Sequence, residues 1–259
     1  MIQDLMIFFD VDGTLISSSH PSLPKTTLIA LKRLQASGYK LGIATGRSKQ
    51  SLIDTGILSQ FAFDGFVLNN GQSVYDANLD LIFEAYFPQS TVERAVELSQ
   101  KLDIPLVLKG PNRIITQPAN EDVHRARAFL NNSIPPVDKY RGEKIGAMVA
   151  YGPENYDYQD YRAISGLHAI PGMSSYCDLT LPDASKRTGI NILCELYACS
   201  NYIGFGDSLN DIEMLAHATI AVAMGNGHEK TKEIANYVTS EIEDDGIYNA
   251  CLHLGLFEK

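Results

Sequence analysis

Two carboxylates stand two residues apart in the run Phe8-Phe9-Asp10-Val11-Asp12-Gly13-Thr14. They follow the continuous apolar run Leu5–Phe9, which is typical of a strand buried on both faces of a parallel sheet. Sites in open α/β sheets form beyond the carboxyl ends of the strands, so Asp10 and Asp12 lie where a catalytic acid is expected. A plain polar turn is the weaker interpretation, because two adjacent carboxylates repel each other unless a cation or a proton compensates.

A second acidic run, Gly204-Phe205-Gly206-Asp207-Ser208-Leu209-Asn210-Asp211, places two carboxylates four residues apart after another short apolar stretch. A helix start with Asp207 or Ser208 as its N-cap explains part of this pattern, and it is compatible with a functional role. The residue types therefore predict a second group of acidic ligands that could join the first.

Two further features could bind an anion. Thr45-Gly46-Arg47 follows a second predicted strand, where a hydroxyl and a backbone N–H can hold a phosphoryl oxygen, although Thr-Gly pairs are also common in loops. Lys186 stands near a predicted helix start with Arg187 beside it, and a helical Lys on its own is usually a solvated residue.

Taken together, these residues predict phosphoryl-transfer chemistry. Mg²⁺ prefers a few carboxylates, several waters and a phosphate oxygen, and Asp10, Asp12, Asp207 and Asp211 would supply the carboxylates. Lys186 and the Thr45–Gly46 backbone would supply charge and donors to a phosphate. Positioning and charge stabilisation provide most of the catalysis in such reactions.

The elements that must position these residues alternate between strand and helix, which predicts an α/β fold with a doubly wound, mainly parallel sheet. In the first third, strands are expected at Leu5–Phe9, Tyr39–Ala44 and Gly65–Leu68, with helices at 24–38 and Ser48–Thr55. In the last third, helices are expected at Ser185–Tyr197, Asn210–His217, Glu229–Ala235 and Asp244–Leu254, with strands at Tyr202–Phe205, Thr219–Ala223 and Tyr237–Thr239.

The middle of the chain has a different pattern. Helices are expected at Ser90–Lys101, Glu121–Leu130 and Tyr158–Ser165, and strands at Leu106–Leu108, Ile114–Thr116 and Ile145–Tyr151. We therefore predict a discontinuous catalytic core, residues 1–83 and 184–259, with an inserted α+β cap domain at 84–183.

Composition limits the possible partners and locations. The 259-residue chain has a net charge of −10, and its Lys and Arg residues form no run, so nucleic acid is not an expected partner. No segment has the apolar length of a membrane span, and the N-terminus does not resemble a signal peptide. The four cysteines form no Cys-x-x-Cys pair, which favours reduced thiols in a cytoplasmic protein over zinc or disulfides. The sequence gives no indication of an oligomeric state.

The motifs Asp10-x-Asp12-Gly13-Thr14, Thr45-Gly46-Arg47, Lys186 and Gly206–Asp211 occur in the order found in the haloacid dehalogenase superfamily, which the chain resembles. The long insertion is similar to the large α/β cap of one branch. Asn69-Asn70-Gly71 and Ala223-Met224-Gly225-Asn226 resemble the Cof-type sugar-phosphate phosphatases of that branch.

This resemblance implies a role for each motif residue. Asp10 would attack phosphorus and form an aspartyl-phosphate, while Asp12 would protonate the leaving oxygen and then activate water. Phosphate binding is implied for Val11, Thr45, Gly46, Lys186 and Asn210. Magnesium binding is implied for the carboxylates of Asp10 and Asp207 and the main-chain carbonyl of Asp12, with Asp211, and also Ser208, acting through water or by orienting the site.

The implied substrate is a small phosphorylated metabolite such as a sugar or polyol phosphate. Superfamily phosphatases carry the second aspartate, here Asp12, which argues for phosphate-ester hydrolysis over carbon–halogen cleavage. Arg187 could replace Lys186 if the helix start is shifted. Two other functions stay open at this point: a phosphomutase on the same core, and a non-catalytic phospho-acceptor or sensor domain.

Overall fold

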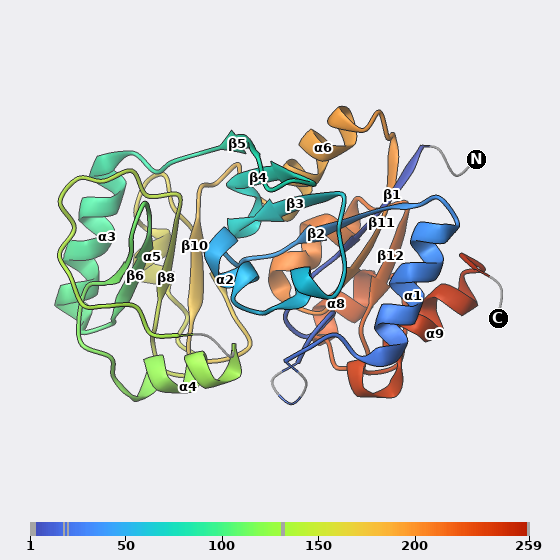
Figure 1. Cartoon of the computed structure of the whole chain (residues 1–259). Helices are drawn as coiled ribbons and strands as arrows, with labels where there is room; N and C mark the ends of the chain where they lie inside the picture. The colour runs from blue at the N-terminus through green and yellow to red at the C-terminus, as the bar shows by residue number, and fades with distance from the viewer. Residues whose placement is uncertain (1–3, 18, 20, 131–132, 258–259) are drawn as a thin grey trace. The chain divides into compact units, whose positions relative to one another are not determined.

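The computed structural model describes residues 4–17, 19, 21–130 and 133–257, and the chain divides into two compact units (Figure 1). The first unit comprises Met1–Phe83 and Ser185–Lys259, and the second comprises Glu84–Ala184. The boundaries expected from the sequence were 83/84 and 183/184, and the roles of the two units as catalytic core and cap stay predictions.

The first unit is built on a sheet that has eight strands within the described residues, in the order β13-β12-β11-β1-β2-β3-β4-β5. The strands that pair in parallel are β13 (Tyr237–Val238), β12 (Ile220–Ala223), β11 (Asn201–Gly206), β1 (Leu5–Phe9), β2 (Lys40–Ala44) and β3 (Gly65–Leu68). β4 (Ser73–Asp76) pairs antiparallel with β3, and β5 (Leu81–Glu84) forms the edge. The mainly parallel sheet confirms the predicted fold class.

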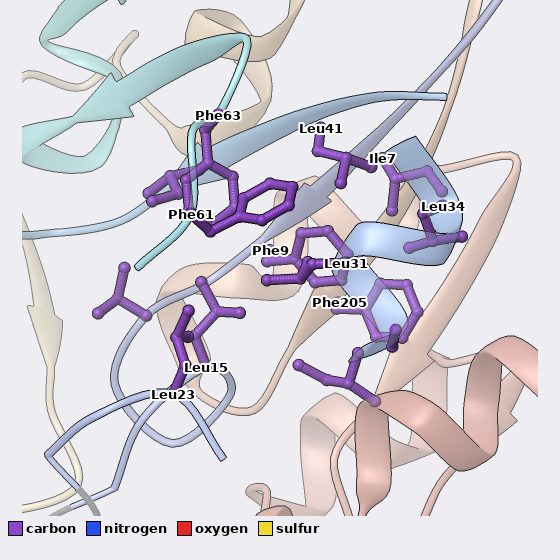
Figure 2. Close-up of a cluster of buried hydrophobic side chains, with 14 of the residues drawn as sticks. Ile7, Phe9, Leu15, Leu23, Leu31, Leu34, Leu41, Phe61, Phe63 and Phe205 are labelled. Atoms are coloured by element: carbon purple, nitrogen blue, oxygen red, sulfur yellow. The ribbon is translucent and has the colours of Figure 1, made fainter. Parts of the chain in front are cut away.

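The central strand β1 is buried on both faces because its side chains alternate between two cores. Ile7 and Phe9 join a cluster that includes Leu31 and Leu34 of α1 (Lys25–Ala36), as Figure 2 shows. Met6 and Phe8 belong to a second cluster on the other face, together with apolar residues of α6 (Lys186–Leu196) and α7 (Ile212–Ala216). The continuous apolar run of β1 is therefore what a strand between two helical layers requires.

The remaining helices of this unit are short. They are α2 (Lys49–Ile53), α8 (Glu229–Ile234) and α9 (Gly246–His253), and α9 packs against α1. Phe205 of β11 stacks on Phe9 of β1 with ring centroids 4.8 Å apart, which ties the strand before one acidic motif to the strand before the other.

The second unit is an α+β module. Among its described residues a five-stranded sheet runs in the order β7-β6-β8-β10-β9, and all its strand pairs are antiparallel. The strands are β6 (Leu106–Lys109), β7 (Arg113–Ile115), β8 (Ala147–Ala150), β9 (His168–Pro171) and β10 (Cys177–Thr180). The helices are α3 (Gln89–Leu102), α4 (Glu121–Phe129) and α5 (Gln159–Arg162). This unit has its own apolar core between the sheet and α3 and α5.

The structure differs from the sequence-based expectations in several short elements. β4, β5, β9 and β10 were not predicted from the sequence. The helix expected over Tyr158–Ser165 is confined to α5, and Tyr158 precedes it with a left-handed backbone (φ 55°). The helix expected from Asn210 begins as a 3-10 turn, Leu209–Asp211, before α7.

None of the described helices is long and apolar enough to cross a membrane. The four cysteines, Cys177, Cys194, Cys199 and Cys251, are buried free thiols. The cytoplasmic location expected from them stays a prediction.

Candidate active site

Four adjacent parallel strands bring residues of the sequence motifs to one edge of the sheet. Asp207 follows β11, Asp10 follows β1, Thr45 follows β2, and Asn69 follows β3. Backbone bonds extend the ladder past the strand ends: the Asp10 N–H donates to the Phe205 carbonyl at 2.9 Å. The parallel topology thus brings together motifs that lie up to two hundred residues apart.

The turn after β1 is fitted closely to Asp207. Gly13 has φ +87°, and a Cβ at this position would lie 2.4 Å from Oδ2 of Asp207. Thr14 Oγ1 donates to Oδ1 of Asp207 at 3.0 Å. Val11 is fully buried, and its carbonyl accepts bonds from the following turn. The glycine is therefore required both by its conformation and by the approach of the carboxylate.

Lys186 lies between two carboxylates at the start of α6. Its Nζ donates to Oδ1 of Asp10 and to Oδ1 of Asp211, both at 2.6 Å. Lys186 and Asp211 are completely buried, and Asp10 is 4% exposed. Ser185 caps the helix by accepting from the Thr188 N–H, which fixes where the helix begins. This start brings Lys186 to the carboxylates, whereas the neighbouring Arg187 is only partly buried.

Asp211 has both oxygens engaged. Its Oδ1 accepts from Lys186, and its Oδ2 accepts from the backbone N–H groups of Asp207 and Ser208 at 3.0 and 2.9 Å. Gly206 allows this arrangement, because a Cβ there would lie 2.5 Å from the Asp211 carboxyl carbon. Asp211 is thus placed to orient Lys186 and the Asp207 loop.

The acidic cluster of Asp10, Asp207 and Asp211 is buried and its carboxylates repel one another, so its ionised form needs positive charge nearby. Burial raises the pKa of Asp10 to about 7, against the lowering effect of Lys186. Burial, with Asp10 and Asp211 as neighbours, also raises the pKa of Asp207 well above its ordinary value. Lys186 compensates only part of this charge, so ionised carboxylates here require a further cation.

The donor set suits a hard divalent cation. Asp10, Asp207 and Asp211 offer carboxylate oxygens that lie within 4.8 Å of one another. Oxygen ligands without His or Cys favour Mg²⁺ and similar ions over zinc or copper. The residues therefore fit a divalent metal, and its identity as magnesium stays a prediction.

The side chain of Asp12 lies outside this cluster and pairs with Arg47. The guanidinium donates from Nη2 to Oδ1 at 2.6 Å and from Nε to Oδ2 at 2.7 Å, a bidentate arrangement. Arg47 is itself held by the carbonyl and hydroxyl of Ser51 in α2 at 3.1 and 3.2 Å. Arg47 was expected only as part of a motif, with no role of its own, because nothing in the spacing indicates which of several carboxylates it contacts.

Thr45 is 1% exposed, and its backbone N–H continues the β2 ladder to the Val67 carbonyl. Its hydroxyl accepts from the Arg47 N–H at 3.2 Å, and Gly46 between them is partly buried. The hydrogen bond between Thr45 and Arg47 therefore stabilises this turn from within.

Asn210 is held at both ends of its carboxamide. Its Nδ2 donates to Asn70 Oδ1 at 2.9 Å, and its Oδ1 accepts from Ser208 Oγ at 2.6 Å. Asn226 closes the other side of the site by donating to the Gly13 carbonyl at 2.8 Å and accepting from the Ile242 N–H. Both asparagine-containing runs noted in the sequence therefore contact the loops of the site.

Comparison with known proteins gives the family. Residues 7–251 match the haloacid dehalogenase-like hydrolase family. Similar curated proteins from Bacillus subtilis include the candidate phosphatase YkrA, 28% identical over 98% of both chains. They also include the 5-amino-6-(5-phospho-D-ribitylamino)uracil phosphatase YitU, 26% identical over 93% of this chain and 94% of that protein.

Solved structures agree. A HAD subclass IIB sugar phosphatase, BT4131, superposes with a TM-score of 0.90 at 30% identity, covering 97% of this chain and 99% of that one. BT1666 from Bacteroides thetaiotaomicron, described among phosphatases of the superfamily, gives 0.87 at 26% identity, covering 98% and 97%. These matches confirm the expected superfamily and class of enzyme: the chain belongs to the haloacid dehalogenase-like hydrolases.

Proposed function

We propose that this hydrolase is a magnesium-dependent phosphatase that acts on small phosphorylated metabolites through an aspartyl-phosphate at Asp10. The observation that carries the proposal is the buried contact of Asp10 with Lys186 beside Asp207 and Asp211. A strand-end carboxylate so surrounded can be kept ionised only by added positive charge, which a bound cation and a phosphate-neutralising lysine would provide.

In the first step, an Asp10 carboxylate oxygen forms a bond to phosphorus while the bond from phosphorus to the ester oxygen breaks. Asp12 gives its proton to that departing oxygen. In the second step, Asp12 takes a proton from water, whose oxygen attacks the phosphorus and releases inorganic phosphate and the Asp10 carboxylate. The Asp12–Arg47 contact holds Asp12 apart from the carboxylates around Lys186 and favours its ionised form, which the second step requires as a base.

The phosphoryl group would be bound by Lys186, by the Thr45 hydroxyl, by the Gly46 and Val11 backbone, and by the Asn210 carboxamide. The bound Mg²⁺ would supply charge stabilisation to a phosphoryl oxygen, with Asp10, Asp207 and the Asp12 carbonyl as ligands. Asp211 has both oxygens occupied by donors, so we assign it to orienting Lys186 rather than to direct metal contact.

The proposed substrate class is a sugar phosphate or a similar polyol phosphate. Two similar proteins support it: BT4131 is a sugar phosphatase, and YitU acts on a phosphorylated ribityl compound. The inserted unit at 84–184 is proposed as the cap that selects the leaving group. No described feature favours the phosphomutase or the phospho-acceptor function.

The test is phosphate release from p-nitrophenyl phosphate and from a panel of sugar and polyol phosphates, ranked by kcat/KM. Asp10→Asn should abolish release with an unchanged circular dichroism spectrum, and EDTA should abolish it in the wild type. Wild-type turnover by Asp10→Asn would refute the nucleophile, and full turnover in EDTA would refute the metal. Isomer formation without phosphate release would indicate a mutase.

A further inference from the structure

The loop Asn69-Asn70-Gly71, which we call the NNG loop, connects β3 to β4 and takes no part in the proposed chemistry. All three residues have a left-handed backbone, with φ of 52°, 54° and 91°. Among L residues, Asn is one of the few that adopt this region readily, and Gly adopts it freely. The sequence Asn-Asn-Gly therefore permits a conformation that most residues would not.

The backbone of the NNG loop is bonded to the Thr45–Arg47 turn. The Asn70 N–H donates to the Thr45 carbonyl at 3.0 Å, and the Asn69 N–H donates to the Arg47 carbonyl at 2.9 Å. The turn that carries the proposed phosphate-binding hydroxyl is thus tied to this loop at both ends.

The side chain of Asn70 reaches a second motif. It is 3% exposed, and its Oδ1 accepts from Asn210 Nδ2 at 2.9 Å across 140 residues of sequence. With Ser208 Oγ bound to the Asn210 oxygen, the orientation of the Asn210 carboxamide is fixed from both sides.

The third contact is steric. A Cβ on Gly71 would lie 1.9 Å from the Ser185 carbonyl, so the loop packs directly against the residue that caps α6 before Lys186. The NNG loop therefore touches the three segments that carry Thr45, Lys186 and Asn210.

We infer that Asn70 is a positioning residue: its carboxamide orients Asn210, and its left-handed backbone sets the Thr45 turn, so that phosphate donors from separate motifs converge. This inference rests on the proposed function, in which Asn210 and Thr45 bind the phosphoryl group. Asn70 acts through Asn210 and does not contact the reacting atoms.

The test is a double-mutant cycle of Asn70→Gly and Asn210→Ala. Glycine keeps the left-handed backbone and deletes only the carboxamide. With p-nitrophenyl phosphate and Mg²⁺, Asn70→Gly should lower kcat/KM by about five- to tenfold, as expected for one lost hydrogen bond. The inhibition constant of inorganic phosphate should rise by a similar factor, with little change in melting temperature.

The cycle should show coupling, because once Asn210 is alanine the loss of Asn70 has nothing left to orient. Asn69→Gly is the matched control: it has the same backbone region, but its carboxamide donates to Ser73. Its effect should be smaller and should multiply independently with that of Asn210→Ala.

Wild-type kcat/KM in Asn70→Gly, or independent effects of Asn70→Gly and Asn210→Ala, would overturn the inference. Failure of the proposed function is distinguishable, because then Asp10→Asn would release phosphate as the wild type does.

Discussion

Lys186→Met removes a buried charge with little change in side-chain length, and it tests the electrostatics of the site directly. Lys186 Nζ lies 2.6 Å from carboxylate oxygens of Asp10 and Asp211, and the lysine is completely buried. Removing one partner of a buried ion pair costs about 3–5 kcal/mol, because the remaining charge is left uncompensated. At about 2–4 °C per kcal/mol, the melting temperature should fall by roughly 6–20 °C at neutral pH.

The loss should depend on pH with a definite sign. Burial raises the pKa of Asp10 to about 7 even though Lys186 lowers it, so removing Lys186 raises that pKa further. The folded variant then holds a proton that the unfolded chain releases near its ordinary pKa of 3.8. The stability of the variant therefore falls as pH rises from about 4 through its folded-state pKa. Wild type undergoes the same loss between about pH 4 and pH 7, so the deficit of Lys186→Met grows above pH 7, where only the variant still holds the proton.

The assay is thermal unfolding followed by circular dichroism in EDTA at pH 5 and pH 8, for wild type, Lys186→Met and Arg187→Met. The arginine is the matched control, since it is adjacent in sequence and only partly buried. A large loss for Lys186→Met that is greater at pH 8 is expected, with a small loss for Arg187→Met. Equal losses at both pH values, or equal losses in the two variants, would refute the reasoning.

Three other predictions concern Arg47, Gly13 and two buried cysteines. Arg47→Lys keeps the positive charge but cannot make the bidentate contact with Asp12. In steady-state assays kcat should therefore fall about 10- to 100-fold, with a smaller change in KM. An unchanged kcat would contradict a role for this pair. Gly13→Ala should lower the melting temperature and weaken stabilisation by Mg²⁺, since the added Cβ would lie 2.4 Å from Asp207 Oδ2. If the variant unfolds as the wild type does, both with and without Mg²⁺, this prediction is wrong. Burial raises the pKa of Cys194 to about 11 and that of Cys251 to about 12. A disulfide exchange reagent at pH 8 should therefore label neither thiol in the native protein and both thiols after denaturation. Rapid labelling of the native protein would show that these thiols are accessible.

The sequence was sufficient to predict the fold class because its strongest signals lie in the central strands. A strand between two helical layers must be apolar on both faces, and Leu5–Phe9 shows this without ambiguity. The edge strand β5 was missed because an edge strand need not be buried: all of β5 is exposed or half-buried. β9 and β10 were missed because neither is a continuous apolar run: β9 begins with His168, and β10 contains Asp178.

Predicting the site requires the order of the strands, which the sequence indicates, and the geometry of the side chains, which it does not. The strand-end positions of Asp10, Thr45 and Asp207 follow from the order of parallel strands, so the sequence could indicate that these residues converge. The pairing of Asp12 with Arg47 could not be predicted in this way. Several carboxylates lie near the carboxyl ends of these strands, and side-chain geometry alone determines which of them the guanidinium meets.

The contacts of the NNG loop could not be predicted from the sequence either. Asn-Asn-Gly indicates a turn with left-handed residues, which local rules can predict. The partners of the loop are Thr45, Ser185 and Asn210, which precede it by 25 residues or follow it by more than a hundred. A turn motif has no local property that selects such partners, so its contribution to the site becomes visible only when the strands place the three segments around it. Sequence patterns therefore predict the proposed reacting groups of this enzyme more readily than the residues that hold them in position.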